Sequence, residues 1–289
     1  MSGGLDVRAG LARRLAACDH ADLGSFVPWY VAGVAVGHVH RERVPLLLAP
    51  GEPFEQRDGR LVLRGSDFAA RSELLAGCVQ RLVARGELRP ELGEHYAVAG
   101  AFDPEPRLQI DRTAVAWFGV RAAGVHLNGF VRTAVGLELW VAVRSKTKRS
   151  HPGQLDNLVA GGAAIGLAPR QTLVKECHEE AGIPADLAAR ALAVGAIRYV
   201  LQDGRSLKPD RLDLFDLELP ADFVPRAVDG EVDSFARWPL ERVAASVLGD
   251  GPWKPNCALV VVDFLLRCGV LDGWLDGSER LALWRRLRG

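Results

Sequence analysis

The amino-acid sequence predicts an α+β protein of two domains. The chain has 289 residues, which suggests about two domains of roughly 150 residues each. Segments with the helical spacing of apolar residues are interleaved with segments that alternate apolar and polar residues as strands do. A polar stretch at residues 103–112 carries two prolines and separates the two halves of the chain. We therefore expect a smaller mixed α+β domain over residues 1–112 and a larger domain over residues 113–289.

The smaller domain is expected to contain two helices with strands between them. Residues 6–18 and 68–85 carry apolar residues at helical spacing, and a Ser-Asp pair precedes the second of these segments, where it can cap the helix. FVPWYVAGVAVGHVH (residues 26–40) and RLVLRG (residues 60–65) are typical of strands interrupted by Gly and Pro.

The larger domain is expected to be rich in strands. AWFGVRAAGVHLNGFV (residues 116–131) is interpreted as two strands around a turn at Gly124. A helix is expected to begin at Pro169, which fits a first helical turn, and to end at Gly182. Further strands are expected at residues 137–144, 158–162, 191–201 and 211–219, and helices at residues 238–248 and 255–271.

Composition limits the classes of partner. Lys+Arg and Asp+Glu are both 36, so the net charge is zero, and no global field favours nucleic acid or an anionic membrane. Apolar runs are too short for a transmembrane helix, and the first twenty residues lack the apolar core of a secretory signal. The five cysteines form no CxxC pair, which favours reduced thiols in a cytoplasmic protein. We expect a small-molecule partner; the oligomeric state is left open.

Three carboxylates gather in VKECHEEAGIP (residues 174–184): Glu176, Glu179 and Glu180. At spacings of three and four residues they share one face of the expected helix and repel one another. A hard divalent cation relieves this repulsion, and Mg²⁺ prefers carboxylate oxygens and is often completed by substrate phosphates. The alternative is a solvated acidic helix face, which is the commoner meaning of such charges on their own. The charge pattern therefore indicates a candidate Mg²⁺ site but does not decide between the two.

The surrounding segment, GGAAIGLAPRQTLVKECHEEAGI, resembles the Nudix box, a loop–helix–loop with the consensus G-x5-E-x7-R-E-U-x-E-E-x-G-U, where U is apolar. Gly161 takes the first glycine and the three glutamates take the R-E-U-x-E-E core, while Lys175 stands at the consensus Arg and Leu167 at the early consensus Glu. The resemblance implies a Nudix α/β/α sandwich whose box helix lies beside a mixed sheet. It also implies that the three glutamates bind Mg²⁺, or Mn²⁺, for hydrolysis of a phosphoanhydride.

Other segments resemble one branch of the Nudix hydrolases. FGVRAAGVHLNGFV, PGQLDNLVAGG, DGEV and WKPNCALVVVDFLLRCG are similar to a branch that carries an extra N-terminal domain, commonly labelled DUF4743, and that is fused in some fungi to thiamine pyrophosphokinase. This resemblance implies hydrolysis of damaged thiamine diphosphate analogues, such as oxothiamine and oxythiamine diphosphates, to a monophosphate plus phosphate. Two alternatives stay open: hydrolysis of ADP-ribose or another nucleoside diphosphate derivative, and a non-catalytic Nudix-derived binding module.

Charged residues outside the box are candidates for the rest of the site. Glu231, in DGEV, is a candidate additional metal ligand or base for the attacking water, with a surface carboxylate as the equal alternative. The loop RSKTKR carries Arg144, Lys146 and Lys148, and such a group can clamp a diphosphate, although short basic runs are usually solvated.

Two positions on a strand and two glycines are also candidates. His126 and Asn128 alternate along one strand and therefore face the same side, where they line the substrate pocket or satisfy buried backbone groups. Gly161 and Gly162 end the short strand before the box and are expected against the substrate.

Three further features have a structural and a functional interpretation. Lys254 and Asn256 flank a proline at a helix start, where capping by Asn256 is the simpler interpretation. Aromatic residues near strands, here Trp29, Tyr30 and Trp117, are mostly core residues, but they can also offer a face to a substrate ring. The FVPWY segment of the N-terminal domain can thereby roof the pocket.

Overall fold

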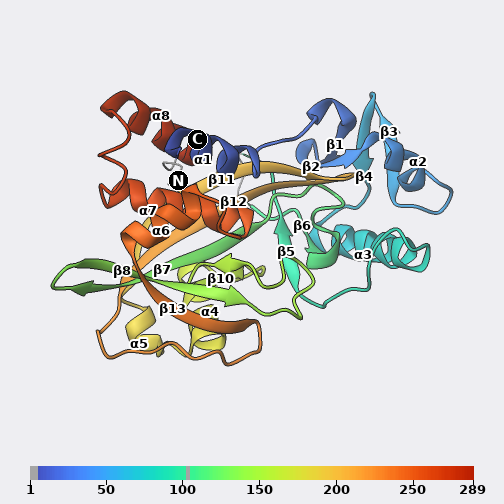
Figure 1. Cartoon of the computed structure of the whole chain (residues 1–289). Coiled ribbons are helices and arrows are strands. Elements are labelled where there is room, and N and C mark those ends of the chain that lie inside the picture. Colours follow the sequence, from blue (N-terminus) through green and yellow to red (C-terminus); the bar gives the residue numbers. More distant parts are fainter. Residues whose placement is uncertain (1–5, 102–104) are drawn as a thin grey trace.

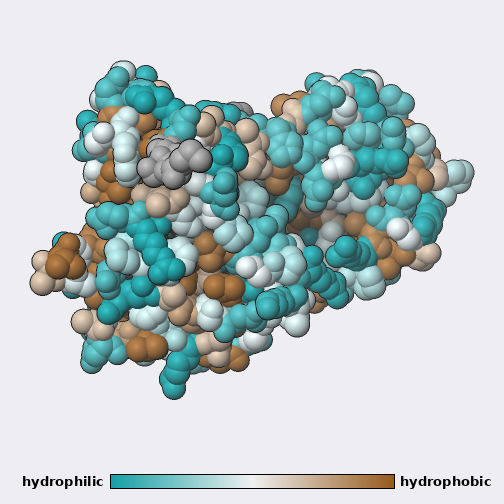
Figure 2. Space-filling view, viewed as in Figure 1, coloured by the Kyte–Doolittle hydropathy of each residue, from teal (hydrophilic) through white to brown (hydrophobic). Residues whose placement is uncertain are grey.

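The computed structural model describes residues 6–101 and 105–289. Asp103 and Pro104, in the stretch where we expect the domain boundary, lie outside the described residues. A larger unit is built around an extended sheet with helices on both faces, and a smaller unit that contains β1 to β6 and α3 lies beside it (Figure 1). In Figure 2, hydrophilic residues cover most of the face shown, and the surface is indented between the two units. No helix of the described residues has both the length and the apolarity that crossing a membrane requires.

The larger unit contains a seven-stranded mixed sheet. Five strands run in the order β11-β12-β7-β8-β13, with β10 paired to β7 and β9 paired to β8. The β12–β7 pair is parallel, and the other pairs are antiparallel. The strands are β7 (Ala123–Thr133), β8 (Gly136–Arg144), β9 (Leu155–Asp156), β10 (Val159–Gly162), β11 (Leu192–Asp203), β12 (Ser206–Glu218) and β13 (Val232–Pro239).

Helices cover both faces of this sheet (Figure 1). On one face, Val125 and Leu127 of β7 share a buried cluster with Leu173 and Cys177 of α4. On the other face, Leu139 and Val141 of β8 belong to a cluster with the apolar residues of α1, α6, α7 and α8. The two faces confirm the expected α/β/α sandwich. The helices are α1 (Val7–Ala16), α4 (Pro169–Ala181), α5 (Ala185–Ala188), α6 (Leu240–Leu248), α7 (Pro255–Arg267) and α8 (Gly277–Arg288).

Helix α4 begins and ends where local sequence signals place it. Pro169 occupies the first helical turn, and the side chain of Gln171 accepts a hydrogen bond from the Ala168 N–H at 2.9 Å. Gly182 has a left-handed φ of 63°, which glycine adopts without strain. Its N–H donates to the His178 carbonyl, and Ile183 N–H donates to the Cys177 carbonyl. The predicted helix bounds are therefore confirmed.

The smaller unit has its own sheet and its own core. Its four-stranded sheet runs β2-β1-β4-β3, and a separate pair joins β5 to β6. The core includes Trp29, Leu75, Leu82, Leu108 and Phe118. The elements are β1 (Phe26–Val31), β2 (Val34–His40), α2 (Val44–Leu47), β3 (Phe54–Arg57), β4 (Arg60–Leu63), α3 (Phe68–Ala84), β5 (His95–Val98) and β6 (Leu108–Asp111), with 3-10 turns η1 (Leu23–Ser25), η2 (Arg41–Arg43) and η3 (Arg112–Ala114).

Helix α1 precedes the smaller unit in the chain but packs elsewhere. Its residues Val7 and Leu11 belong to the core of the larger unit, and α1 packs against α6 and α7. At Gly10, a Cβ atom would lie 2.1 Å from the Leu248 carbonyl oxygen, so the close approach of α1 to α6 requires glycine.

Three details of secondary structure differ from the expectation. Residues 116–122 form no strand, because Gly119 adopts φ 57° and its position against the His38 carbonyl oxygen leaves only 2.1 Å for a Cβ atom. Trp238 and Pro239 still belong to β13, and α6 starts at Leu240. Helix α8 was not anticipated; its capping box pairs Asp276 with Glu279.

The aromatic residues of FVPWY do not roof the pocket described below. Trp29 is fully buried, and its indole N–H donates to the Phe118 carbonyl at 2.9 Å. Tyr30 lies under the guanidinium of Arg60 and lines a separate cavity of the smaller unit. Trp117 is buried under Arg43. The expectation of an aromatic roof from FVPWY is wrong because β1 is an inner strand of the smaller unit, flanked by β2 and β4.

Candidate active site

The three box glutamates lie along α4 with few cations near them. Lys175 Nζ donates to Glu179 Oε2 at 2.6 Å and to Glu176 Oε1 at 3.1 Å. Glu180 is 6% exposed, and its Oε2 accepts a hydrogen bond from the Ala160 N–H of β10 at 2.9 Å. Burial raises the pKa of Glu180 to about 8 and also raises the pKa of Glu176. Within the described residues, Lys175 alone forms ion pairs with these three carboxylates.

The two glycines of β10 allow close approach from both faces of the strand. A Cβ atom on Gly161 would lie 2.2 Å from Cγ of Glu176, and one on Gly162 would lie 1.7 Å from Oη of Tyr96. Successive residues of a strand face opposite sides, so Gly161 faces α4 and Gly162 faces the smaller unit. Strand β10 therefore lies between Glu176 and Tyr96, and both of its glycines line the pocket described below.

Glu231 lies directly before β13 and forms an ion pair. Its Oε2 is 2.5 Å from Lys148 Nζ, and its side chain is 45% exposed. Its charge contributes to the raised pKa of Glu180, so the two carboxylates are close enough to interact. Lys148 thus lies at the acidic face, whereas Lys146 of the same loop is exposed to solvent.

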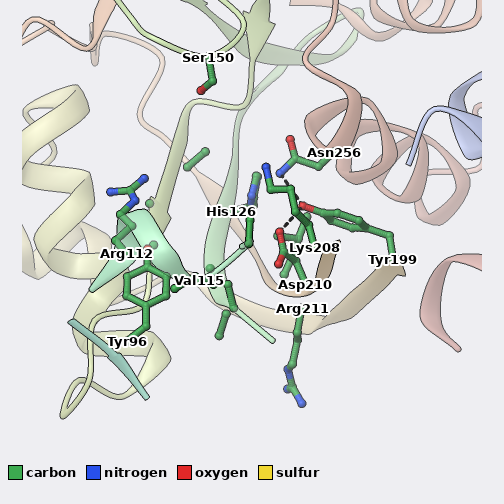
Figure 3. A pocket seen from close by; sticks show the side chains of 18 of the residues that line it. Tyr96, Arg112, Val115, His126, Ser150, Tyr199, Lys208, Asp210, Arg211 and Asn256 are labelled. Carbon is green, nitrogen blue, oxygen red and sulfur yellow. Dashed lines mark hydrogen bonds between the residues drawn. The ribbon is translucent and has the colours of Figure 1, made fainter. Parts of the chain in front are cut away.

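A pocket of about 330 Å³ lies where the two units meet. Tyr96 and Arg112 of the smaller unit stand on one side of it, opposite Tyr199 and Asp210, with His126 between them (Figure 3). The residues that line the pocket include Tyr96, Arg112, His126, Gly161, Gly162, Tyr199, Lys208, Asp210, Lys254 and Asn256.

The far wall of the pocket carries a hydrogen-bonded chain. Tyr199 Oη donates to Asp210 Oδ2 at 2.9 Å, and Asn256 Nδ2 donates to Tyr199 Oη at 3.5 Å. Burial raises the pKa of Asp210, and the charge of Lys208 opposes that rise. Burial also lowers the pKa of His126 to about 4, so this imidazole is neutral near pH 7.

Sequence reasoning missed most of these wall residues. Lys208 and Asp210 alternate along β12, and this pair of charged residues on one side of a strand was the available signal. The capping role expected for Asn256 is wrong: Lys254 holds the N-cap position, no side chain caps α7, and Asn256 is directed at Tyr199 instead.

Behind the pocket, a network of buried charges joins β7, β9 and α7. Arg144 Nη1 is 2.6 Å from Asp156 Oδ2, and Lys254 Nζ is 3.6 Å from the same oxygen. Asn128 Nδ2 donates to Asp216 Oδ1 at 3.0 Å, and Arg267 pairs with Asp216. Arg144 and Asn128 are therefore structural members of this network and do not line the pocket.

Three residues of this region form a second candidate metal site. The ligand atoms of His126, Asp156 and Cys257 lie within 4.8 Å of one another, and within the described residues this is the one such group. Asp156 already has Arg144 and Lys254 as cationic partners, and burial raises the pKa of the Cys257 thiol, which keeps it protonated. The carboxylate oxygens of the three glutamates do not all lie that close together. By the chemistry of the ligand atoms, however, hard oxygens with an excess of negative charge suit Mg²⁺ better than this group does.

Comparison with known proteins gives the family. The family described as "Domain of unknown function (DUF4743)" matches residues 10–122. Nudix hydrolase 20, chloroplastic, of Arabidopsis thaliana is 37% identical over 276 residues, which cover 90% of this chain and 73% of the relative. Nudix hydrolase 24, chloroplastic, of the same plant is also 37% identical, over 274 residues that cover 92% of this chain and 73% of the relative.

Solved structures are similar at lower identity. DR0079 of Deinococcus radiodurans is 22% identical with a TM-score of 0.44, over 59% of this chain and 98% of that one. The Nudix domain of Shewanella oneidensis NrtR, solved with ADP ribose, is 14% identical with a TM-score of 0.42, over 55% of this chain and 94% of that one. On the strength of the two plant relatives, this chain belongs to the Nudix hydrolase family and is a hydrolase acting on pyrophosphate bonds.

Proposed function

We propose that this hydrolase uses Mg²⁺, or Mn²⁺, to cleave the diphosphate of damaged thiamine diphosphate analogues. Oxothiamine and oxythiamine diphosphates are the proposed substrates, and a monophosphate and inorganic phosphate are the products. Glu176, Glu179 and Glu180 are the proposed metal ligands and catalytic carboxylates. Glu231 is proposed to act with them from outside the box.

The imbalance of charge on α4 carries the proposal for the metal. Within the described residues, the ammonium group of Lys175 pairs with Glu176 and Glu179, and no cation pairs with Glu180. Burial raises the pKa of Glu176 and of Glu180. Clustered carboxylates in such surroundings either take up protons or bind a cation. A bound divalent ion neutralises phosphate oxygens and makes its bound water a stronger nucleophile.

The chain's own residues arrange the reacting groups. The Ala160 N–H fixes the carboxylate of Glu180, and Gly161 leaves room for Glu176 against β10. Lys148 holds Glu231 at the edge of the acidic face, where a carboxylate can accept a proton from the attacking water.

The size and polarity of the pocket support a compact heterocycle as the organic group. At about 330 Å³ it is near the lower end of ligand pockets, which span roughly 300 to 1,000 Å³, and this size favours a two-ring heterocycle over ADP-ribose. Asp210 offers an acceptor, while Lys208 and Asn256 offer donors. Polar complementarity of this kind discriminates between analogues, because a mismatched buried group is left without a hydrogen bond.

Kinetics on a panel of diphosphates tests the substrate. We expect kcat/KM with oxothiamine or oxythiamine diphosphate to exceed that with thiamine diphosphate, ADP-ribose and nucleoside triphosphates at equal Mg²⁺. If kcat/KM with ADP-ribose or a nucleotide is about tenfold higher than with the thiamine analogues, which corresponds to about 1.4 kcal/mol of transition-state binding, the thiamine assignment is wrong. Tight binding of a diphosphate without phosphate release would instead indicate a non-catalytic binding module.

A further inference from the structure

Arg112 of the smaller unit faces the site that the larger unit forms. Its side chain is about half exposed and lines the pocket. In Figure 3 it stands with Tyr96 on the wall opposite Lys208 and Asp210. The smaller unit therefore places an arginine at the pocket of a pyrophosphate hydrolase.

A buried carboxylate fixes the turn from which Arg112 projects. Asp111 is 4% exposed, and it accepts hydrogen bonds from the N–H groups of Gly93 and Thr113, each at 2.8 Å, and of Leu92 at 3.1 Å. These bonds tie the loop that carries Glu94 to the turn η3 that Arg112 opens. Such a fixed turn reduces the entropy that the arginine loses on binding a ligand.

Glu94 holds Arg112 at two points. The Arg112 N–H donates to the Glu94 carbonyl at 2.8 Å, and Nη1 donates to Glu94 Oε2 at 2.7 Å. In the described part of the chain, this carboxylate is the side-chain partner that Arg112 has. Nε and Nη2 therefore remain available to a ligand, and their planar arrangement suits two oxygens of one phosphate.

The same segment of the smaller unit touches the Nudix box. The His95 carbonyl accepts a hydrogen bond from the Ile165 N–H of the box loop at 2.8 Å, and the Tyr96 hydroxyl lies against Gly162. The charge of Glu231 acts on Arg112, and the charge of Glu94 acts on Glu176. Arg112 thus lies at the junction between the pocket and the acidic face.

Several other cations near the site are already paired. Arg144 is bound to buried Asp156, Lys148 to Glu231, and Arg211 of the pocket wall to Asp213. The basic loop that the sequence offered as a phosphate clamp is therefore largely occupied.

We infer that Arg112 binds the diphosphate of the substrate, so that the unit of unknown function completes the active site. This inference rests on the proposed function for its substrate class, a magnesium diphosphate ester. Nη1 stays with Glu94, and the edge formed by Nε and Nη2 contacts phosphate oxygens. Arg112 is then a substrate-binding residue, and Glu94 positions it.

Substitution of Arg112 with measurement of KM and kcat tests the inference. We expect Arg112→Gln to raise KM for the diphosphate substrate by on the order of tenfold or more, since hydrogen bonds between charged partners are the strong ones. Arg112→Lys should be intermediate, because it keeps the charge and loses the planar geometry. Arg89→Gln is the matched control, since Arg89 is exposed in the same unit and does not line the pocket. A KM for Arg112→Gln equal to that of wild type overturns the inference.

A binding experiment separates this inference from the proposed function. Calorimetry with inorganic pyrophosphate and Mg²⁺ should show weaker binding to Arg112→Gln and unchanged binding to Arg89→Gln. If wild type cleaves no diphosphate but Arg112→Gln still weakens pyrophosphate binding, the proposed function fails and the role of Arg112 stands. If all three proteins bind pyrophosphate equally, the inference is wrong whatever the activity. If Arg112→Gln lowers the melting temperature, the pyrophosphate affinity of Arg112→Lys, compared with that of wild type, tests the inference instead.

Discussion

Two clusters of charged side chains, one on α4 and one between the sheet and α7, differ in their balance of charge. On α4, within the described residues, Lys175 pairs with Glu176 and Glu179, and Glu180 has no cationic partner. Between the sheet and α7, each buried carboxylate has at least one cation of its own. The pairs are Asp156 with Arg144 and Lys254, Asp216 with Arg267, and Asp263 with Arg267 and Arg288.

This difference in charge balance indicates that the cluster between the sheet and α7 is structural and that the cluster on α4 is functional. Matched charges under low solvent exposure stabilise a fold only when every member keeps its partner. Unmatched carboxylates cost stability unless a cation binds. The network at Asp156 is therefore expected to govern stability, and the acidic face of α4 is expected to govern activity through a metal.

The largest expected effect is that of metal removal. After treatment with a chelator, phosphate release should fall to background, because the negative face of α4 then has no divalent ion to neutralise the diphosphate. Added Mg²⁺ or Mn²⁺ should restore it. Full activity in excess chelator after metal stripping would contradict the account.

Breaking the buried network should produce the largest loss of stability. Asp156→Asn leaves Arg144 and Lys254 without their carboxylate, and loss of one partner of a buried ion pair costs about 3–5 kcal/mol. Denaturant unfolding measures this free energy. An unfolding free energy equal to that of wild type would show that the network is not structural.

The pH dependence of the unfolding free energy, compared between wild type and Asp156→Asn, tests the same network a second time. Burial opposes the charge of Asp156, but Lys254 and Arg144 hold its pKa at about 2, below the usual 3.8. A carboxyl group with a lowered pKa contributes stability above its unfolded pKa and loses it as pH falls through the folded value. The difference in unfolding free energy between wild type and Asp156→Asn should therefore decrease as the pH falls from about 4 toward 2.

Glu179→Gln should show the opposite pattern from Asp156→Asn. It removes a charge and a hard ligand but keeps the length of the side chain, so kcat should fall by about 10² or more. The melting temperature should stay close to that of wild type, because one repulsive charge is also removed. Glu73→Gln, at an exposed position of α3, is the control. Wild-type turnover by Glu179→Gln would mean that the site lies elsewhere.

The smallest expected effect comes from filling the space beside Glu176. In Gly161→Ala the new Cβ atom would lie 2.2 Å from Glu176 Cγ, so the glutamate must shift. Overpacking of this kind costs about 1–3 kcal/mol, and a shifted Glu176 should also lower kcat. Gly273→Ala, where a Cβ atom meets nothing within 4 Å and the backbone is not left-handed, is the control for the added methyl group. Equal kcat for both variants would argue against a role for this contact.

Local signals in the sequence predicted much of the fold. Pro169 and Gly182 bound α4 because each acts through its own backbone preferences, and the glutamates follow from their spacing on that helix. Residues 116–122 were wrongly predicted as strand, because their shape depends on Gly119 meeting β2, a contact between distant segments. Alternation of residues in one strand cannot show such a contact.

The sequence predicted the residues of the site only where they lie close together in one segment of the chain. The box glutamates lie within five residues, but Tyr96, Arg112 and Asp210 come from three separate segments that meet only in the folded chain. The role of Arg144 depends on its pairing with Asp156. Sequence gives the charge of an arginine but not its partner.

Binding of Mn²⁺ tests the central comparison most directly, because it decides which cluster holds the metal. Calorimetric titration of wild type, Glu179→Gln and Cys257→Ser with Mn²⁺ compares the acidic face with the group of His126, Asp156 and Cys257. The account predicts that Glu179→Gln weakens Mn²⁺ binding by about tenfold or more, as loss of one charge-assisted contact implies, while Cys257→Ser binds as wild type does. Weakened binding by Cys257→Ser together with unchanged binding by Glu179→Gln would contradict it.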